Sequence, residues 1–154
     1  MADAGRGAAE IARELERVKK DIRLIALLDT LEYLRKGGRI SNVTGIVGSM
    51  LSIKPIVVAR DGLIELNGKA RGAKNASKLF TTQIEEAGEI DYDMPYAVAY
   101  SGLDDRMLED YVADHEDIWK AKNDKLEFRI VGSAIGTHAG PGAIAVAYFE
   151  KSLL

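Results

Sequence analysis

The chain has 154 residues, 47% of them apolar, and a formal net charge of -3, which fits one domain with a substantial core and argues against the basic face that nucleic-acid binders carry. It contains no cysteine, which excludes disulfides, zinc–thiolate sites and cysteine nucleophiles. Because the opening residues lack the apolar segment of a signal peptide and no apolar run reaches the roughly 18 residues of a membrane span, we expect a cytoplasmic protein with no membrane span.

The first predicted element is an amphipathic helix near the N-terminus. Its apolar residues recur at helical spacing between charged ones, at Ile11, Leu15, Val18 and Ile22. Such a narrow apolar stripe needs a cover, so a homodimer formed through it is one hypothesis.

A strand and two helices are predicted next. RLIALLDT, residues 23–30, indicates a buried strand, and LEYLRKGG, residues 31–38, a short helix that ends at its two glycines. Residues 43–53 are apolar and place Gly45 and Gly48 on one side of a predicted helix. That side would be a shallow groove lined by backbone, and close helix packing is the alternative explanation for it.

The middle of the chain combines turn signals with a helical pattern. Asp61-Gly62 and Asn67-Gly68 both suit the positive φ angles of a tight hairpin, so we predict short antiparallel strands around each. Residues 72–88 then predict a helix that ends at a glycine, with Leu79 and Ile84 facing inward.

The C-terminal third continues the alternation of strands and helices. Three strands are predicted, over residues 95–102, 126–132 and 143–150. The last is so continuously apolar that we expect both of its faces to be covered. Asp104 or Asp105 can cap a helix that runs to about residue 121. The whole pattern predicts an α/β, or α+β layered, domain in which helices flank a mixed β-sheet.

Most motifs that mark a catalytic or metal site are missing. GKARGAK, residues 68–74, has the wrong spacing for a P-loop, and no GxGxxG or GxSxG sequence is present. His115 lies at helical spacing from Leu108, Tyr111 and Ile118, which indicates the edge of a packed face. With only two histidines, far apart in the sequence, we predict no metal site and no catalytic residue.

The stretch GTHAGPG, residues 136–142, places a histidine among glycines. It is either an ordinary turn or a loop that brings the His138 imidazole, the Thr137 hydroxyl and free backbone N–H groups to a ligand. A loop of the second kind suits an anionic or polar head group, to which Arg39 could add charge. An enzyme that uses His138 as a general base is the weaker hypothesis, because no nucleophile or metal can be paired with it.

Three blocks of sequence together resemble the C-terminal half of the DegV family. They are LDTLEYLRKGGRIS, then LSIKPIV followed by DGLIELNGKARGAK, and finally IGTHAGPGAIAVAYF, so that the resemblance covers residues 28–149. It implies a bacterial fatty acid-binding protein related to the lipid-carrying subunit of fatty acid kinase. Such a protein has no enzymatic activity and no cofactor; its ligand is a long-chain fatty acid that it presents to a separate kinase subunit.

The resemblance also implies where the ligand lies. In that family the acyl chain occupies an apolar tunnel, while the carboxylate sits at the junction with an N-terminal domain, near the place where the kinase subunit docks. The residues expected at the polar mouth are Arg39, Ser41, Gly136, Thr137, His138 and Gly140. The residues expected in the apolar wall are Ile46, Met50, Leu51, Ile53 and Ile144.

One departure from the family is large. Its N-terminal domain, which supplies Thr and Ser hydroxyls to the carboxylate, has no counterpart here except residues 1–22, a helical lead-in that would match its last helix. Residues 23–154 would then form the lipid-binding domain, and a separate chain or a second copy could supply the missing half. The alternative hypothesis is an interaction or scaffold domain without lipid, which docks through Arg35, Lys36 and Arg39.

Overall fold

The computed structural model of the chain describes residues 1–40, 52–119, 126 and 128–151. Its helices are α1 (Ala8–Val18), α2 (Glu32–Lys36), α3 (Ala73–Glu86), α4 (Arg106–Asp114), α5 (Glu116–Trp119) and α6 (Ser133–Ala139), with short 3₁₀ helices η1 (Ala2–Ala4) and η2 (Lys19–Asp21). Its strands are β1 (Ile22–Leu27), β2 (Ile53–Arg60), β3 (Leu63–Arg71), β4 (Ala97–Ser101), β5 (Phe128–Ile130) and β6 (Ala143–Phe149).

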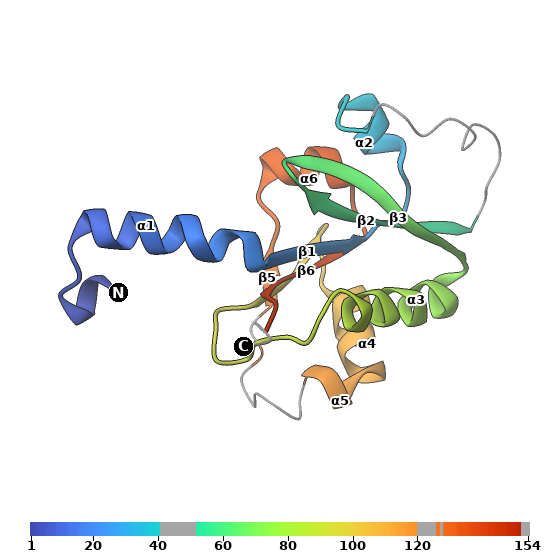
Figure 1. The fold of residues 1–154 in the computed structure, drawn as a ribbon. Helices are drawn as coiled ribbons and strands as arrows, with labels where there is room; N and C mark the ends of the chain where they lie inside the picture. The colour runs from blue at the N-terminus through green and yellow to red at the C-terminus, as the bar shows by residue number, and fades with distance from the viewer. Residues whose placement is uncertain (41–51, 120–125, 127, 152–154) are drawn as a thin grey trace.

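The strands form one mixed sheet in the order β3-β2-β1-β6-β4-β5. Neighbouring strands are antiparallel except β4 and β5, which are parallel. Helices α3, α4 and α5 lie on one side of the sheet, and α2 and α6 lie on the other (Figure 1). The predicted mixed sheet flanked by helices is therefore confirmed. None of the described helices is both long enough and apolar enough to cross a lipid bilayer.

The side of the sheet under α3, α4 and α5 carries the main hydrophobic core, and we call it the core face. Because side chains alternate between the two faces of a strand, every second residue of the central strands contributes to it. Its most deeply buried members are Ile25, Ile56, Phe80, Ile84, Val98, Leu108, Trp119, Ile144, Val146 and Tyr148. Large side chains packed at this density provide most of the stability of the fold.

The opposite side, under α2 and α6, carries a smaller buried cluster, and we call it the site face. Its buried cluster consists of Leu28, Leu34, Ile40, Val57 and Ala143. On β6 this face continues with Ala145 and Ala147, which are only half-buried. The expectation that both faces of β6 are covered therefore holds for the core face and only in part for the site face.

The hairpin turn between β2 and β3 is the first of the two predicted tight turns. Asp61 and Gly62 have φ angles of 51° and 78°. Two successive residues at positive φ are what a two-residue hairpin of the right twist requires, so this prediction is confirmed.

The second predicted turn, at Asn67-Gly68, is wrong. Both residues lie inside β3, at a bulge opposite Ile56 and Val57. A Cβ atom on Gly68 would overlap the side-chain nitrogen of Gln83 and lie 3.3 Å from Leu79. The glycine therefore serves the close approach of α3 to the bulged strand, which no local pattern reveals.

The helix predicted from Asp104 or Asp105 to about residue 121 is interrupted. It begins after Asp105, as expected, but neither aspartate caps it with its side chain; the Asp104 carboxylate accepts a 2.9 Å hydrogen bond from Arg106, which lowers the pKa of that carboxyl. The chain leaves the helical conformation at His115, so α4 and α5 are separate helices. The His115 ring lies against Tyr111, with ring centres 4.8 Å apart, at the edge of the core as predicted.

The predicted helix over residues 43–53 lies almost entirely outside the described residues. Ile53, placed at its end, instead begins β2, and Ser52 before it has a φ angle of 82°. A residue in that left-handed conformation ends any helix, so the chain enters the strand from a turn.

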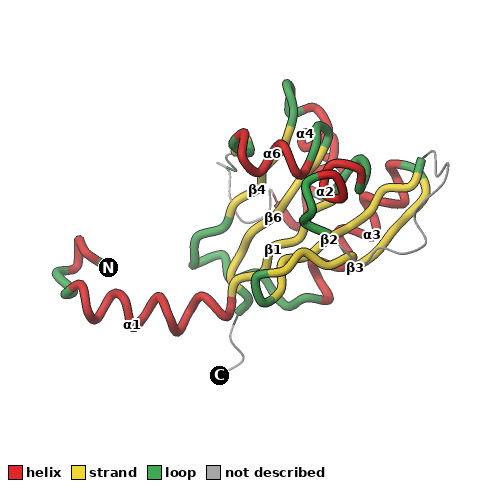
Figure 2. The backbone as a smooth tube through the Cα atoms, turned by 90° about the horizontal axis from the view of Figure 1, so that it is seen from above, coloured by secondary structure: helices red, strands yellow, loops and turns green. Residues whose placement is uncertain are grey.

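Helix α1 extends away from the sheet in both views (Figure 1 and Figure 2). Val18, at its end, is buried, but Leu15 is 52% exposed and Ile22 is 43% exposed. The predicted stripe is thus present and largely uncovered, although Ile22 belongs to β1 and not to the helix.

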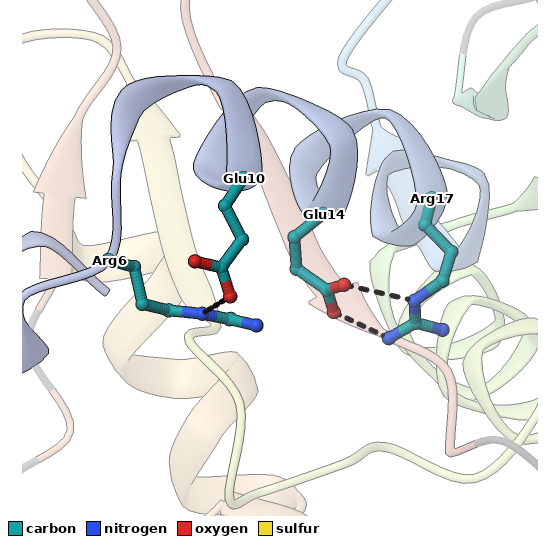
Figure 3. Close-up of polar contacts among 4 residues, drawn as sticks. All are labelled: Arg6, Glu10, Glu14 and Arg17. Atoms are coloured by element: carbon teal, nitrogen blue, oxygen red, sulfur yellow. Dashed lines mark hydrogen bonds and ion pairs between the residues drawn. The ribbon is translucent and has the colours of Figure 1, made fainter.

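Ion pairs between residues three or four positions apart lie on the polar side of α1. The pairs drawn in Figure 3 are Arg6 with Glu10 at 2.8 Å and Arg17 with Glu14 at 2.7 Å. The hydrogen bond from Arg17 lowers the pKa of Glu14. Exposed pairs at this spacing add little to stability, so the helix depends on what covers its apolar side.

Candidate functional site

The candidate site lies at one end of the site face, where α2 and α6 pack together. Helix α2 follows β1, and α6 precedes β6. Because β1 and β6 are neighbours, with Leu27 opposite Ile144, the two helices come to lie over the same end of the sheet. Residues that are about a hundred positions apart in the sequence meet there.

The stretch GTHAGPG, which the sequence indicates to be either a turn or a ligand-binding loop, is helical over much of its length. Residues 136–139 complete α6, and only residues 140–142 form the connection to β6. Gly136 is helical and faces the sheet, since a Cβ atom there would lie 3.4 Å from the hydroxyl of the buried Ser101. Gly140 ends the helix with a φ angle of 76°, the conformation that favours glycine.

Two rings and two glycines make the contact between α2 and α6. The His138 imidazole lies against Gly37, where a Cβ atom would overlap Nδ1 and lie 2.6 Å from Cε1. The Tyr33 ring lies against Gly140 in the same way, where a Cβ atom would overlap Cδ2 and lie 2.7 Å from Cε2. Each helix thus receives a ring from the other at a position that has no side chain.

The two ring nitrogens of His138 are in different surroundings. Nδ1 is fully buried and has no hydrogen-bond partner among the described residues. A buried N–H without an acceptor is rarer and costlier than a buried lone pair without a donor. Nδ1 is therefore a poor place for a proton, and a neutral ring in this position would carry its proton on Nε2.

Thr137 and Arg39 differ in how they relate to His138. The Thr137 hydroxyl donates to the Ser133 carbonyl oxygen at 2.8 Å, so it is bonded to its own helix. Arg39 is exposed and its guanidinium donates to the Gly37 carbonyl oxygen at 3.0 Å. Arg39 and His138 therefore both contact Gly37, Arg39 through the carbonyl oxygen and His138 through its ring.

The predicted apolar wall is divided between the two faces. Ile144 is 1% exposed and belongs to the core face, so the sheet separates its side chain from α6. Ile53 alternates with Val57 onto the site face, the same face as His138. The other predicted site residues, Ser41, Ile46, Met50 and Leu51, lie outside the described residues.

Several residues at this end of the sheet were not among the predicted site residues. Tyr33 and Gly37 complete the packing of α2 on α6, and an ion pair joins Lys54 of β2 to Asp29 after β1. Gly142, with a φ angle of 72°, lies against Asp29. The repeated glycines in both segments were the signal for close packing, but its partners could not be read from sequence.

A separate cleft of about 860 Å³ opens on the core face, between α3 and α4. Leu27, Met107, Tyr111 and Ile144 contribute apolar surface to it, and Lys54, Lys74, Lys78, Asp110 and Asp114 contribute charged groups. Burial raises the pKa of Tyr111 to about 12, so its hydroxyl stays protonated at neutral pH. Among the described residues, no group of acidic or histidine side chains could hold a metal ion.

Comparison with known proteins gives a consistent result. The sequence profile of the family described as "Uncharacterised protein, DegV family" matches residues 1–151. A DegV domain-containing protein of Clostridium perfringens is 33% identical over 144 residues, which are 92% of this chain and 50% of that protein. The chain spans about half the length of the curated relatives it matches.

Solved structures agree with this result. A DegV family protein from Thermus thermophilus, described by its fatty acid binding, has a TM-score of 0.76 and 26% identity over 96% of this chain and 52% of that chain. The Streptococcus pneumoniae fatty acid kinase (Fak) B3 protein, loaded with linoleic acid, has a TM-score of 0.78 and 21% identity over 97% of this chain and 52% of that chain.

Proposed function

This chain belongs to the DegV family, and from that premise we propose that it binds a long-chain fatty acid at the site face, with the carboxyl group at His138. It would do so without catalysis and present the acid to a separate kinase subunit, which supplies the phosphoryl-transfer chemistry. The fatty acid binding of the Thermus thermophilus relative supports the ligand class. The kinase role is the more distant step, because it is suggested by a similar fold at 21% identity.

The observation that carries the proposal is the burial of Nδ1 of His138 without a hydrogen-bond partner among the described residues. Nδ1 lies against Gly37, so in this proposal Nε2–H is the group that donates to the carboxylate. A hydrogen bond to a charged group contributes about 1.5 to 3 kcal/mol. The exposed guanidinium of Arg39, which contacts the same glycine, would add favourable charge.

The acyl chain would lie against the apolar cluster beside His138. Ala139, which follows the histidine, already packs against that cluster, and Ile53 faces the same side. Each buried methylene contributes about 0.8 kcal/mol, so a chain of about fifteen would contribute roughly 12 kcal/mol before ordering costs are subtracted. In this proposal Ile144 is a core residue and not part of the wall.

The half of the relatives that this chain does not match would supply the remaining groups around the carboxylate. A separate polypeptide or a second copy could provide them, and the uncovered apolar side of α1, with Leu15 52% exposed, offers it a surface. Losing those groups weakens the polar end of the site but leaves the larger apolar contribution in place.

Native mass spectrometry of the chain purified from a bacterial host tests the proposal, followed by solvent extraction and identification of any released acid. We expect a stoichiometric adduct with the mass of a long-chain fatty acid. His138→Ala should reduce the occupied fraction, whereas His115→Ala, the matched control on the core face, should leave it unchanged.

A chain that remains free of ligand after incubation with fatty acids would contradict the proposal for this half alone. The scaffold hypothesis, in which Arg35, Lys36 and Arg39 form a docking surface, would then be preferred. It predicts that His138→Ala leaves partner binding unaltered.

A further inference from the structure

Two short helices such as α2 and α6 do not need a ring packed on a glycine in order to stay together. Small apolar side chains at both positions would serve that purpose. The chain instead places a bare backbone opposite each ring, His138 opposite Gly37 and Tyr33 opposite Gly140. One of these rings is the proposed ligand-binding histidine, so the arrangement controls where its imidazole lies.

We propose that Gly37 and Tyr33 are positioning residues for His138. Gly37 provides the space in which Nδ1 is sealed, and Tyr33 fixes α6 at the glycine that ends it. Together they hold the imidazole in one orientation and one tautomer, with Nε2–H directed to the ligand. The part of this inference that concerns ligand binding rests on the proposed function, but the part that concerns the orientation of the ring does not.

The backbone conformation does not explain the glycine at position 37. Its φ angle is -78°, which any residue adopts, and alanine is the better residue at the end of a helix in that conformation. Its neighbour Gly38 is different, since it has a φ angle of 65° and open space where a Cβ atom would be. A glycine is therefore needed at position 37 because the His138 ring lies against it, and at position 38 because the backbone there has a positive φ angle.

The contact at Gly37 is chiefly with the imidazole. A Cβ atom there would overlap Nδ1 of His138, while the next nearest group outside the ring, the Tyr33 carbonyl oxygen, would lie 3.2 Å away. An alanine would thus displace the ring, which can rotate, before it would disturb the helix. The expected consequence is a misplaced histidine in a folded protein.

Tyr33 acts from the other side of the same junction. Its ring fills the position above Gly140 while the side chain remains 39% exposed. Tyr33→Phe keeps the ring and should preserve the position of α6, whereas Tyr33→Ala removes the ring and should let α6 move. The aromatic ring, and not the hydroxyl, is the part that positions His138.

The direct test is the ¹⁵N spectrum of the two histidine rings in the chain without ligand. For the original chain we expect one tautomer at His138, protonated at Nε2. Gly37→Ala and Tyr33→Ala should each convert this signal to an exchange-averaged mixture, while Tyr33→Phe and Gly132→Ala should not. Gly132 is the matched control because it adjoins α6, has a φ angle of -63° and has open space at its Cβ position.

Affinity for palmitate provides the second readout, measured by titration of each variant after removal of bound lipid. His138→Ala should weaken binding roughly 10-fold or more. Gly37→Ala should weaken it to a similar extent, and the double variant should be no weaker than either single variant, because both changes remove the same hydrogen bond.

The outcomes separate this inference from the proposed function. If Gly37→Ala leaves both the His138 tautomer and palmitate affinity unchanged, or if the two substitutions weaken binding additively, the positioning role is wrong. If the original chain binds no palmitate but the tautomer responds as described, the positioning role stands and the proposed ligand is wrong. Should Gly37→Ala fail to fold, the comparison of Tyr33→Ala with Tyr33→Phe decides the question.

Discussion

The two faces of the sheet contact their helices through different kinds of residue. On the core face, strands and helices meet through large side chains such as Phe80, Trp119 and Tyr148, each no more than 1% exposed. On the site face, helices α2 and α6 meet through glycines and two rings, and the buried cluster beside them is smaller, with Leu34 and Val57 among its members. One face excludes water by filling space, and the other brings backbone close to a polar ring.

Because of this difference, we expect substitutions on the core face to affect stability and substitutions at the contact of α2 with α6 to affect the proposed binding. A residue on the core face can be changed only at the cost of packing, because its neighbours fill the space around it. At the contact of α2 with α6 on the site face, a glycine lies against each ring, and under the proposed function the position of the His138 ring there governs binding. Substitutions on the two faces should therefore fail in different ways.

The largest expected effect is on the core face. Phe80→Ala removes a fully buried ring from between α3 and the sheet and should lower the free energy of unfolding by about 3 to 5 kcal/mol. Urea unfolding at neutral pH measures this loss. Because the site face keeps its own contacts, the His138 ring signals should stay at their original positions as long as the variant is folded.

A loss of less than about 1 kcal/mol for Phe80→Ala would contradict the comparison, because it would mean that the core face is not densely packed. Displaced His138 signals in the folded variant would contradict it in another way. They would show that the two faces are coupled through the sheet.

A smaller loss of folding stability is expected at alkaline pH. Burial raises the pKa of Tyr111 and of Tyr148 from the ordinary 10.0 to about 12. Because these values are higher in the folded chain than in the unfolded chain, the associated stability is fully present below pH 10 and is lost as the pH rises toward 12. Each unit of difference corresponds to about 1.4 kcal/mol.

Absorbance of tyrosinate during a pH titration, combined with urea unfolding at each pH, checks this expectation. Tyr148→Phe should remove part of the loss of stability between pH 10 and 12, although it also removes the 3.0 Å hydrogen bond from the hydroxyl to the Ile84 carbonyl oxygen. Stability that does not fall over this range would show that the two phenols are not buried as described.

The elements that periodicity governs could be predicted from the sequence. The stripe of α1, the strand that became β1 and the Asp61-Gly62 hairpin are local patterns, and each of them is found in the structure, although β1 is buried only in part. Asn67-Gly68 carries the same local signal as Asp61-Gly62, but the packing of Gln83 and Leu79 against it places it inside a strand. The local sequence alone cannot tell a hairpin turn from a bulge inside a strand, because the difference depends on the helix that packs against the strand.

The candidate site could be predicted only in part, for a related reason. His138 and Arg39 were found because an imidazole and a guanidinium among glycines are unusual. Gly136 and Gly140 suggested a loop, whereas Gly136 lies within α6 and faces Ser101 of β4, and only Gly140 ends the helix. The part played by Tyr33 depends on a contact between segments far apart in the chain, which one sequence does not contain.

We propose that the Nε2–H group of His138 holds a fatty acid carboxylate on the site face. We would test it with palmitate labelled with ¹³C at the carboxyl carbon, added to ¹⁵N-labelled chain from which lipid has been removed. We expect a bound carboxyl signal that shifts together with Nε2 of His138, leaves the His115 ring unperturbed and moves to a different chemical shift in His138→Ala. A bound carboxyl signal at the same chemical shift in His138→Ala would show that the histidine does not hold the carboxylate.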